Sequence, residues 1–338
     1  MKTSPTFSIP AHKNKILWLL GGLVLLSAVM SMCFGAVFVA PGDILSVLFG
    51  TQRGTPQSQI LLYSRLPRTC GCLLAGSALA VSGAVIQNVL HNPLAAPNVI
   101  GVNSGAGLAV ALCCAAAPAA VWAVPAAAFC GALVGSLTVF FVSKAAGASR
   151  MTLVLAGIAL SGMFGAGIDG VIKLAPDALN GYSDFRIGGF SNLSMERITP
   201  AFWIILMALL AVFALAGEMD VLALGEETAR SLGLSTQRVR LVLLGCAAAL
   251  AGGAVSFAGL VGFVGLIVPH TMRRLAGEEG AAFLAACALG GGALVTFCDL
   301  GARVLFAPYD LPVGIVLSLL GGGFFLWLLM RQKGGHRG

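Results

Sequence analysis

Long apolar runs alternate with short polar segments along almost the whole chain. A helix that crosses a membrane needs about 20 consecutive apolar residues, so each run predicts one span. We expect about ten transmembrane helices in one bundle, and hence one all-α integral membrane domain over residues 1–338. The expected spans are 16–38 (span 1), 69–117 (spans 2 and 3, about 69–90 and 98–117), 124–174 (spans 4 and 5, about 124–143 and 151–174), 200–217 (span 6) and 239–330 (spans 7 to 10, about 239–258, 261–275, 281–306 and 312–330).

Prolines and glycines interrupt two of these apolar regions. The segment HNPLAAP (91–97) separates spans 2 and 3, and Pro269-His270 lies inside span 8. Such interruptions predict broken or re-entrant backbone, which membrane proteins tolerate where it is buried or lines a cavity. Each interruption follows a Gly-Ala-Val triplet, at 83–85 and at 253–255. This weak internal repeat is typical of transporters.

The polar interval Met219–Arg240 is the longest stretch of mixed charge between two long apolar blocks. Within it, Glu226–Leu232 is predicted to form a short amphipathic helix, because Gly225 precedes it and Gly233 stands where a left-handed C-terminal cap would fall. Glu226 lies one turn before Arg230, which favours an exposed helix. A short helix between spans is suited to docking against a soluble partner, and an ordinary solvated loop is the alternative.

Composition excludes a soluble protein. The chain is 58% hydrophobic and 10% charged, with a mean hydropathy of +0.95. Soluble domains carry about a quarter charged residues. The net charge of +7 comes mainly from the connections between spans, so it indicates topology rather than nucleic-acid binding. Most lysines and arginines lie on one side when both termini and Met219–Arg240 are placed in the cytoplasm, as the positive-inside rule requires.

No enzymatic or metal chemistry is indicated. The nine cysteines form no CxxC pair and lie at no zinc spacing from a histidine, so small packing residues are the preferred interpretation and no metal site is predicted. The chain has no GxxxxGK[ST] phosphate loop, no GxSxG and no HExxH. Its membrane carboxylates, Asp169 with Lys173 and Asp299 with Arg303, are expected to pair along their own helices near the outer end.

Four ordered motifs carry a resemblance to a known family. They are RLPRTCGCLLAGSALAVSGAVIQNVLHNPLAAPNVIGVNSGAG (65–107), LALGEETARSLGL (222–234), GLVGFVGLIVPHTMRRLAG (259–277) and LPVGIVLSLLGGGFFLWLL (311–329). They closely resemble the permease subunits of ABC importers for iron–siderophores, haem and cobalamin, the type II importers with FecCD-like permeases. The chain departs from the pattern at Cys70–Cys72, where larger aliphatic residues are expected. It also departs at Gly321–Gly323, where the family usually shows one glycine followed by alanine and proline.

The resemblance implies a multi-subunit assembly in a bacterial cytoplasmic (inner) membrane. Two permease chains, identical or paralogous, would pair around a central pathway within the lipid. Two ATPase subunits would bind their cytoplasmic face and hold ATP and magnesium, so this chain would carry no cofactor and no catalysis of its own. A substrate-binding protein would deliver the cargo from outside. No nucleic acid takes part.

The resemblance also implies roles for particular residues. Those implied for coupling to the ATPase are Leu224, Gly225, Glu226, Glu227, Ala229, Arg230, Leu232 and Gly233. Those implied for docking of acidic residues from the two lobes of the binding protein are Arg65, Arg68 and Arg303. The alternative for these three is that Arg303 pairs with Asp299 while the other two meet lipid headgroups. Those implied for lining the pathway are Gly157, Gly162, Gly165, Gly314, Ser318 and Gly321. Those implied for structure within the motifs are Asn92, Pro93, Pro269 and His270.

Three functional hypotheses remain open at this stage. The first is the importer permease, with a ferric siderophore as the favoured cargo because it is the commonest in such a family; haem and cobalamin stay open. The second is an ion-coupled secondary carrier, which ten spans and a repeat would permit. Such a carrier needs a membrane carboxylate that titrates or binds a cation, and the sequence supplies only self-paired ones. The third, a membrane enzyme, lacks a nucleophile–base or metal constellation.

Overall fold

A computed structural model describes residues 11–35, 37–48, 55–147, 150–191 and 193–334. All regular secondary structure within these ranges is helical. The elements are α1 (Ala11–Cys33), α2 (Pro41–Leu48), α3 (Pro56–Ile60), η1 (Leu61–Arg65), α4 (Leu66–Leu90), η2 (Pro97–Ile100), α5 (Val102–Ala116), η3 (Val121–Ala123), α6 (Val124–Ala145), α7 (Arg150–Leu174), α8 (Ala178–Ile187), α9 (Met195–Ala214), α10 (Ala216–Ala223), α11 (Glu226–Ser231), α12 (Thr236–Ala258), α13 (Val264–Ala276), α14 (Gly280–Leu305) and α15 (Val313–Gly334).

A helix lies at each position where a span was predicted, which confirms the all-α membrane fold. Among the described residues, seven helical segments are long and apolar enough to cross a membrane; they contain α1, α4, α6, α7, α9, α12 and α14. The other three are shorter: α5, α13 and the apolar part of α15 (Val313–Leu326). The boundaries differ in places. Span 1 was expected to reach Phe38, but α1 ends at Cys33 and a separate helix follows.

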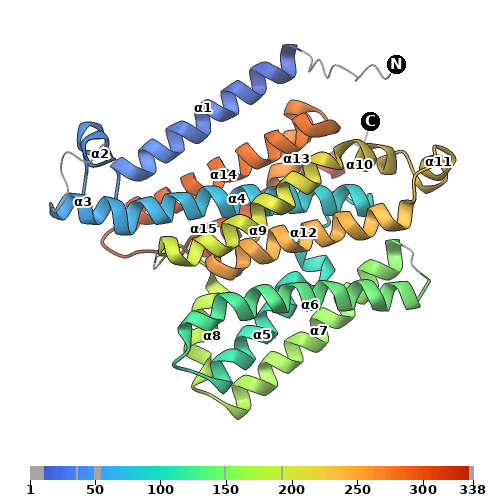
Figure 1. The fold of residues 1–338 in the computed structure, drawn as a ribbon, viewed down its shortest axis with the longest axis horizontal. Helices are drawn as coiled ribbons and strands as arrows, with labels where there is room; N and C mark the ends of the chain where they lie inside the picture. Colours follow the sequence, from blue (N-terminus) through green and yellow to red (C-terminus); the bar gives the residue numbers. More distant parts are fainter. Residues whose placement is uncertain (1–10, 36, 49–54, 148–149, 192, 335–338) are drawn as a thin grey trace.

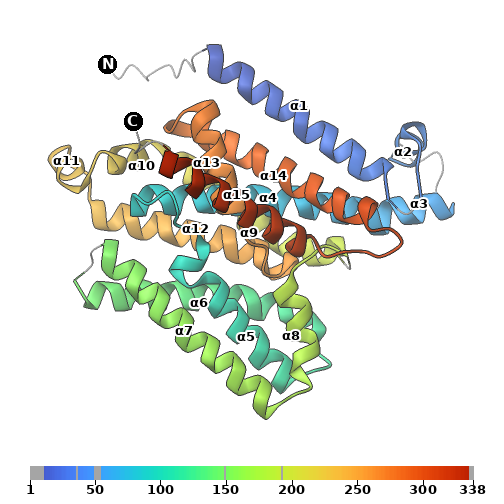
Figure 2. The same cartoon turned by 180° about the vertical axis from the view of Figure 1, so that it is seen from behind.

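The helix α4 forms the centre of the bundle. Of the apolar stretch in the segment that contains α4, 78% is buried inside the protein, whereas the share for α7 is 17%. It packs between α14 on one side and α12 on the other, while α5 to α8 form a separate group beside α12 (Figures 1 and 2). Small residues permit this close packing, as is usual where helices meet in a membrane. A Cβ atom on Gly76 would lie 2.2 Å from the carbonyl oxygen of Gly291, and one on Gly83 would lie 2.0 Å from that of Gly265.

We expect Gly83→Ala to destabilise the protein, because its methyl group would force α4 and α13 apart. Overpacking of this kind costs about 1–3 kcal/mol. Gly21→Ala in α1 is the matched control: nothing lies within 4 Å of its Cβ position, and alanine favours a helix over glycine by about 1 kcal/mol. Thermal unfolding in detergent should show a lower midpoint for the first variant only. Equal midpoints for the two variants would contradict this account of the packing.

The backbone is broken between spans 2 and 3, as the prolines and glycines predicted, and also before span 8, where no break was predicted. His91 (φ 49°) and Gly101 (φ 78°) adopt left-handed conformations in the first break. In the second, the non-helical segment 259–263 joins α12 to α13, and Leu260 N–H donates to the carbonyl of Phe185 at the end of α8 (2.9 Å). These breaks separate the short helices α5 and α13 from the long helices that precede them.

The expected helix break at Pro269 is wrong, because α13 continues through it. A proline cannot donate a backbone hydrogen bond to the carbonyl four residues earlier, which here belongs to Gly265. The side chain of Gln87 in α4 supplies the missing donor, with its Nε2 2.9 Å from that carbonyl oxygen. His270, the residue after Pro269, packs edge-on against Phe324 of α15, with ring centroids 5.7 Å apart. The motif Pro269-His270 therefore lies at the contact of α13 with α4 and α15.

Candidate functional site

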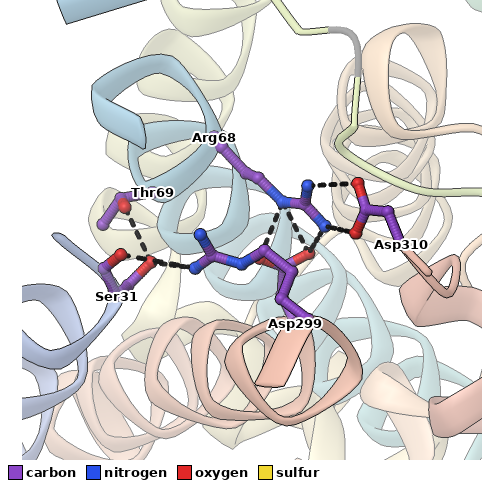
Figure 3. A network of polar contacts seen from close by, with 6 residues as sticks. Ser31, Arg68, Thr69, Asp299 and Asp310 are labelled. Carbon is purple, nitrogen blue, oxygen red and sulfur yellow. Dashed lines mark hydrogen bonds and ion pairs between the residues drawn. The ribbon is translucent and has the colours of Figure 1, made fainter. Parts of the chain in front are cut away.

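Arg68, near the start of α4, lies between two carboxylates from distant parts of the chain (Figure 3). Its Nε and Nη2 donate to Asp299 of α14, each at 2.9 Å. Its Nη1 and Nη2 donate to Asp310, in the connection between α14 and α15, at 2.7 and 2.9 Å. Bidentate pairs of this kind are the strongest hydrogen bonds a guanidinium makes. Arg68 therefore ties α4 to α14 and to the connection that leads into α15.

Arg303 extends the same network toward α1. It lies one turn after Asp299, and its Nε is 3.2 Å from Asp299 Oδ2, which confirms the predicted pairing along the helix. Its Nη2 donates to the hydroxyl of Ser31 (2.8 Å), and Ser31 is hydrogen-bonded to Thr69 (2.8 Å). The network therefore joins α1, α4 and α14 at one end of the bundle, which we call the arginine end.

Arg65 serves a different purpose at the arginine end. Its guanidinium donates to the carbonyl oxygens of Met32 (2.6 Å), Cys33 (2.8 Å) and Val37. The last carbonyls of a helix have no intrahelical partner and carry partial negative charge, so a cation at this position is favourable. Arg65 is thus the cap that holds the end of α1.

Arg65 and Arg68, which the family resemblance implies for docking of a binding protein, both have partners inside the chain. Arg65 is 4% exposed and Arg68 is 6% exposed, so neither is positioned to meet lipid headgroups. Their docking role stays a prediction. Sequence reasoning missed Asp310, which stands immediately before the LPVG motif. The available signal was charge balance, since three arginines at one end of a membrane bundle need more counter-charge than Asp299 supplies.

Asp310 lies outside the helices, and its side chain is 43% exposed. Partial burial would raise the pKa of this carboxyl, but the hydrogen bonds from Arg68 outweigh it and lower the pKa below its usual value. The Ser191 hydroxyl donates a further hydrogen bond that acts in the same direction. Asp310 is therefore ionised at neutral pH and is the accessible member of the network.

The opposite end of the bundle carries the helix predicted from its flanking glycines. The helix α11 spans Glu226–Ser231, within one residue of the prediction, and Gly233 adopts the expected positive φ (85°). Gly225, which precedes the helix, also has a positive φ (110°). Ala229 is fully buried against the bundle. The flanking leucines point outward instead, since Leu224 is 61% exposed and Leu232 is 64% exposed. The element thus presents apolar side chains to whatever lies beyond this end, which we call the α11 end.

Polar contacts tie α10 and α11 to three long helices. Glu226 accepts hydrogen bonds from Arg230 one turn on (2.6 Å) and from Arg240 of α12 (3.0 Å). His91, at the end of α4, lies 3.1 Å through its Nε2 from the carbonyl oxygen of Ala223. Asp220 of α10 accepts the Gly280 N–H at the start of α14 (3.0 Å). Glu226 thus links α11 to α12, while α10 is linked to the end of α4 and the start of α14.

We expect Glu226→Gln to loosen α11 from α12, because it removes the charge that holds Arg240. A partly exposed ion pair contributes up to about 1 kcal/mol, so hydrogen exchange of the Ala229 amide should become about fivefold faster. Glu227→Gln is the matched control, since Glu227 is exposed and forms no ion pair among the described residues. Equal exchange rates in the two variants would show that the contact does not anchor the helix.

The glycines expected to line a pathway fall into two groups. Gly162 and Gly165 of α7 have nothing within 4 Å of a Cβ position, so they lie on an open face. The other three do not fit a lining role, because a Cβ on each would meet another part of the chain. A Cβ on Gly157 would lie 1.8 Å from the carbonyl oxygen of Val99, and one on Gly314 would lie 1.9 Å from that of Ile187. A Cβ on Gly321 would lie 2.1 Å from the Phe263 ring. Ser318 donates to the carbonyl of Gly314 in its own helix (2.7 Å).

The comparisons with known proteins agree with this architecture. The family model described as "FecCD transport family" matches residues 23–331. The hemin transport system permease protein HmuU of Yersinia pestis is 36% identical over 85% of this chain and 87% of its own. The Fe(3+)-citrate import system permease protein YfmE of Bacillus subtilis is 32% identical over 92% and 93%. The vitamin B12 import system permease protein BtuC of Escherichia coli O9:H4 is 34% identical over 97% and 99%.

A solved structure supports the same assignment at the level of the fold. It is described as an inward-facing conformation of a metal-chelate type ABC transporter, and it superposes with a TM-score of 0.84 at 27% identity, over 94% of this chain and 99% of that one. The family match covers almost the whole chain, and the relatives are transport permeases over nearly their full lengths. The chain belongs to the FecCD transport family and is a multi-pass permease of a type II ABC importer.

Proposed function

We propose that this permease forms the translocation pathway for a ferric siderophore, in an assembly with a second permease chain, two ATPase subunits and an extracytoplasmic substrate-binding protein. The observation that carries the proposal is α11, which presents Leu224 and Leu232 outward while Glu226 anchors it to Arg240 of α12. A short amphipathic helix of this kind suits a groove on a partner protein. The ATPase subunits would bind ATP and magnesium and drive transport through this helix.

The orientation follows from charge. Cytoplasmic segments of membrane proteins carry the excess of lysine and arginine. The α11 end is then cytoplasmic and the arginine end faces outward, in a bacterial cytoplasmic membrane. The described part of α1 begins, and that of α15 ends, toward the α11 end (Figure 2), which supports cytoplasmic positions for both termini.

An iron chelate is favoured over cobalamin as the cargo. Relatives named for two iron-containing substrates, Fe(3+)-citrate and hemin, support this choice, beside relatives named for vitamin B12. The Fe(3+) dicitrate permease FecC of Escherichia coli K12, 35% identical over 94% of this chain, is a further relative named for an iron chelate. Among iron chelates we propose a ferric siderophore, because it is the commonest cargo in such a family.

Reconstitution tests the proposal. The permease, the ATPase and the binding protein of the same system are incorporated in proteoliposomes, and uptake of a hydroxamate siderophore, ferric citrate, hemin and cobalamin is compared. We expect ATP-dependent uptake of the ferric siderophore above the other three. A preference for hemin or cobalamin would overturn the choice of cargo. Uptake that persists with an inactive ATPase and collapses with the ion gradient would instead indicate a secondary carrier.

We expect Gly165→Trp to reduce uptake at least tenfold without loss of folded protein. The open face of α7 can hold a bulky side chain, but that side chain would project into the pathway that we place between two permease chains. Gly165→Ala should transport normally. Gly157→Trp should instead fail to fold, because the carbonyl of Val99 occupies the space. Normal uptake by Gly165→Trp, together with no thiol labelling of cysteines placed along α7, would remove this helix from the pathway.

A further inference from the structure

Asp310 is more exposed to solvent than the other charged side chains of the network. Its side chain is 43% exposed, whereas the side chains of Arg68, Asp299 and Arg303 are 7%, 0% and 9% exposed. It covers one edge of the Arg68 guanidinium, formed by Nη1 and Nη2, while Asp299 holds the Nε side (Figure 3). Asp310 therefore stands between Arg68 and anything that approaches from the arginine end.

The charges at this end favour an incoming carboxylate. Among the residues that the structure describes, the ion pairs of Arg68 and Arg303 involve two aspartates, Asp299 and Asp310, and Arg65 is held by backbone carbonyls. If Asp310 leaves, the cluster carries a second uncompensated positive charge in a site largely withdrawn from solvent. A buried unpaired charge is costly, so Asp310 leaves readily only when another carboxylate takes its place. The geometry for such a replacement already exists, because the free edge of a guanidinium binds a carboxylate through two parallel hydrogen bonds.

The position of Asp310 also affects the neighbouring helices. Two residues later, Pro312 packs on Gly189, where a Cβ would lie 3.5 Å from the proline ring. The Gly314 N–H, at the start of α15, donates to the carbonyl of Gly188 just beyond α8 (3.3 Å). Gly188, Gly189 and Pro312 also line a cavity of about 490 Å³. Pro312, the last residue of the connection 306–312, thus lines this cavity, and the hydrogen bond of Gly314 to Gly188 joins the start of α15 to the end of α8.

We propose that a carboxylate of the extracytoplasmic binding protein exchanges with Asp310 on Arg68, so that docking releases the connection 306–312 and loosens the contact of α15 with the end of α8. No covalent bond changes, and the charge of the network is the same before and after the exchange. This inference rests on the proposed function, since it requires a binding protein that docks at the arginine end. It adds that Arg68 is held by an internal competitor until the partner arrives.

Docking affinity measured with the permease in nanodiscs tests the exchange. The probe is the purified binding protein of the same transport system. Asp310→Asn removes the competitor, so we expect about tenfold tighter docking, the value of one or two charge-assisted hydrogen bonds. Asp177→Asn is the matched control: it removes one exposed carboxylate just before α8, which forms no ion pair among the described residues, and it should leave the affinity unchanged. Unchanged or weaker docking by Asp310→Asn, or an equal gain in both variants, would overturn the exchange.

A second measurement needs no substitution. Hydrogen exchange of the unmodified permease is compared with and without the binding protein. We expect the Gly314 amide to exchange several-fold faster in the docked complex, because its bond to Gly188 is loosened. Slower or equal exchange would overturn the release of the connection. If the unmodified permease does not bind the binding protein at all, the proposed function is contradicted in its choice of partner, and so is the exchange. Docking without either effect would refute the exchange alone.

Discussion

Arg68→Glu is expected to abolish recovery of folded protein, rather than only to weaken docking of a partner. The substitution would place three carboxylates together in a largely buried site, where Arg68 now pairs with Asp299 and Asp310. Removing one partner of a buried ion pair costs about 3–5 kcal/mol. Reversing its charge adds repulsion, and typical domains have only about 5–15 kcal/mol of stability. The yield of monodisperse protein extracted from membranes measures the effect.

Two further variants test whether the loss of folded protein is caused by disruption of the buried network or by any change of charge. Arg186→Glu reverses an exposed arginine of α8 and should be recovered normally. Arg68→Leu combined with Asp310→Asn removes one positive and one negative charge and leaves Asp299 paired with Arg303, so it should recover much of the lost yield. If Arg68→Glu is recovered as well as Arg186→Glu, the buried network does not stabilise the fold.

Ala229→Pro is expected to lower uptake, and stimulation of the ATPase by cargo-loaded binding protein, by at least tenfold while leaving the protein inserted. Ala229 donates the first backbone hydrogen bond of α11, to the carbonyl of Gly225 (2.9 Å). Proline removes this donor and its ring collides with the same carbonyl, at a cost of about 3 kcal/mol. The helix would then no longer present Leu224 and Leu232 together.

Glu227→Pro is the control for this prediction. It lies in the first turn of α11, where the backbone N–H has no intrahelical partner and proline is tolerated. ATPase stimulation in proteoliposomes should be close to normal for this variant. Normal stimulation in Ala229→Pro would show that α11 does not couple the two proteins. Loss of both variants from the membrane would show that the element serves folding instead.

Features with local causes were predictable from the sequence. The ten helical positions follow from apolar length, because a helix that crosses lipid satisfies its own backbone groups and needs no information from elsewhere in the chain. The bounds of α11 followed from its flanking glycines, because Gly225 precedes it and Gly233 provides a left-handed C-terminal cap. The pairing of Asp299 with Arg303 followed from their spacing of one turn.

Features that depend on distant partners were decided only by the tertiary structure. Arg68 and Asp310 are 242 positions apart, and nothing near either residue shows that packing of α4 against α14 brings them together. The same packing converts an expected surface arginine into a buried one, because a charge withdrawn from solvent must find its counter-charge within the fold.

The prolines and glycines show the same division. Pro269 lies inside a continuous helix, where Gln87 donates a hydrogen bond to the carbonyl of Gly265, 178 positions from Gln87, which the proline leaves without its usual donor. Gly157 and Gly165 lie in the same helix, yet one meets a carbonyl and the other meets open space. Apolar length determined where the helices lie along this chain. The role of each polar or small residue was determined by its neighbours, because hydrogen bonds and steric contacts act only over the few ångströms that the packed helices establish.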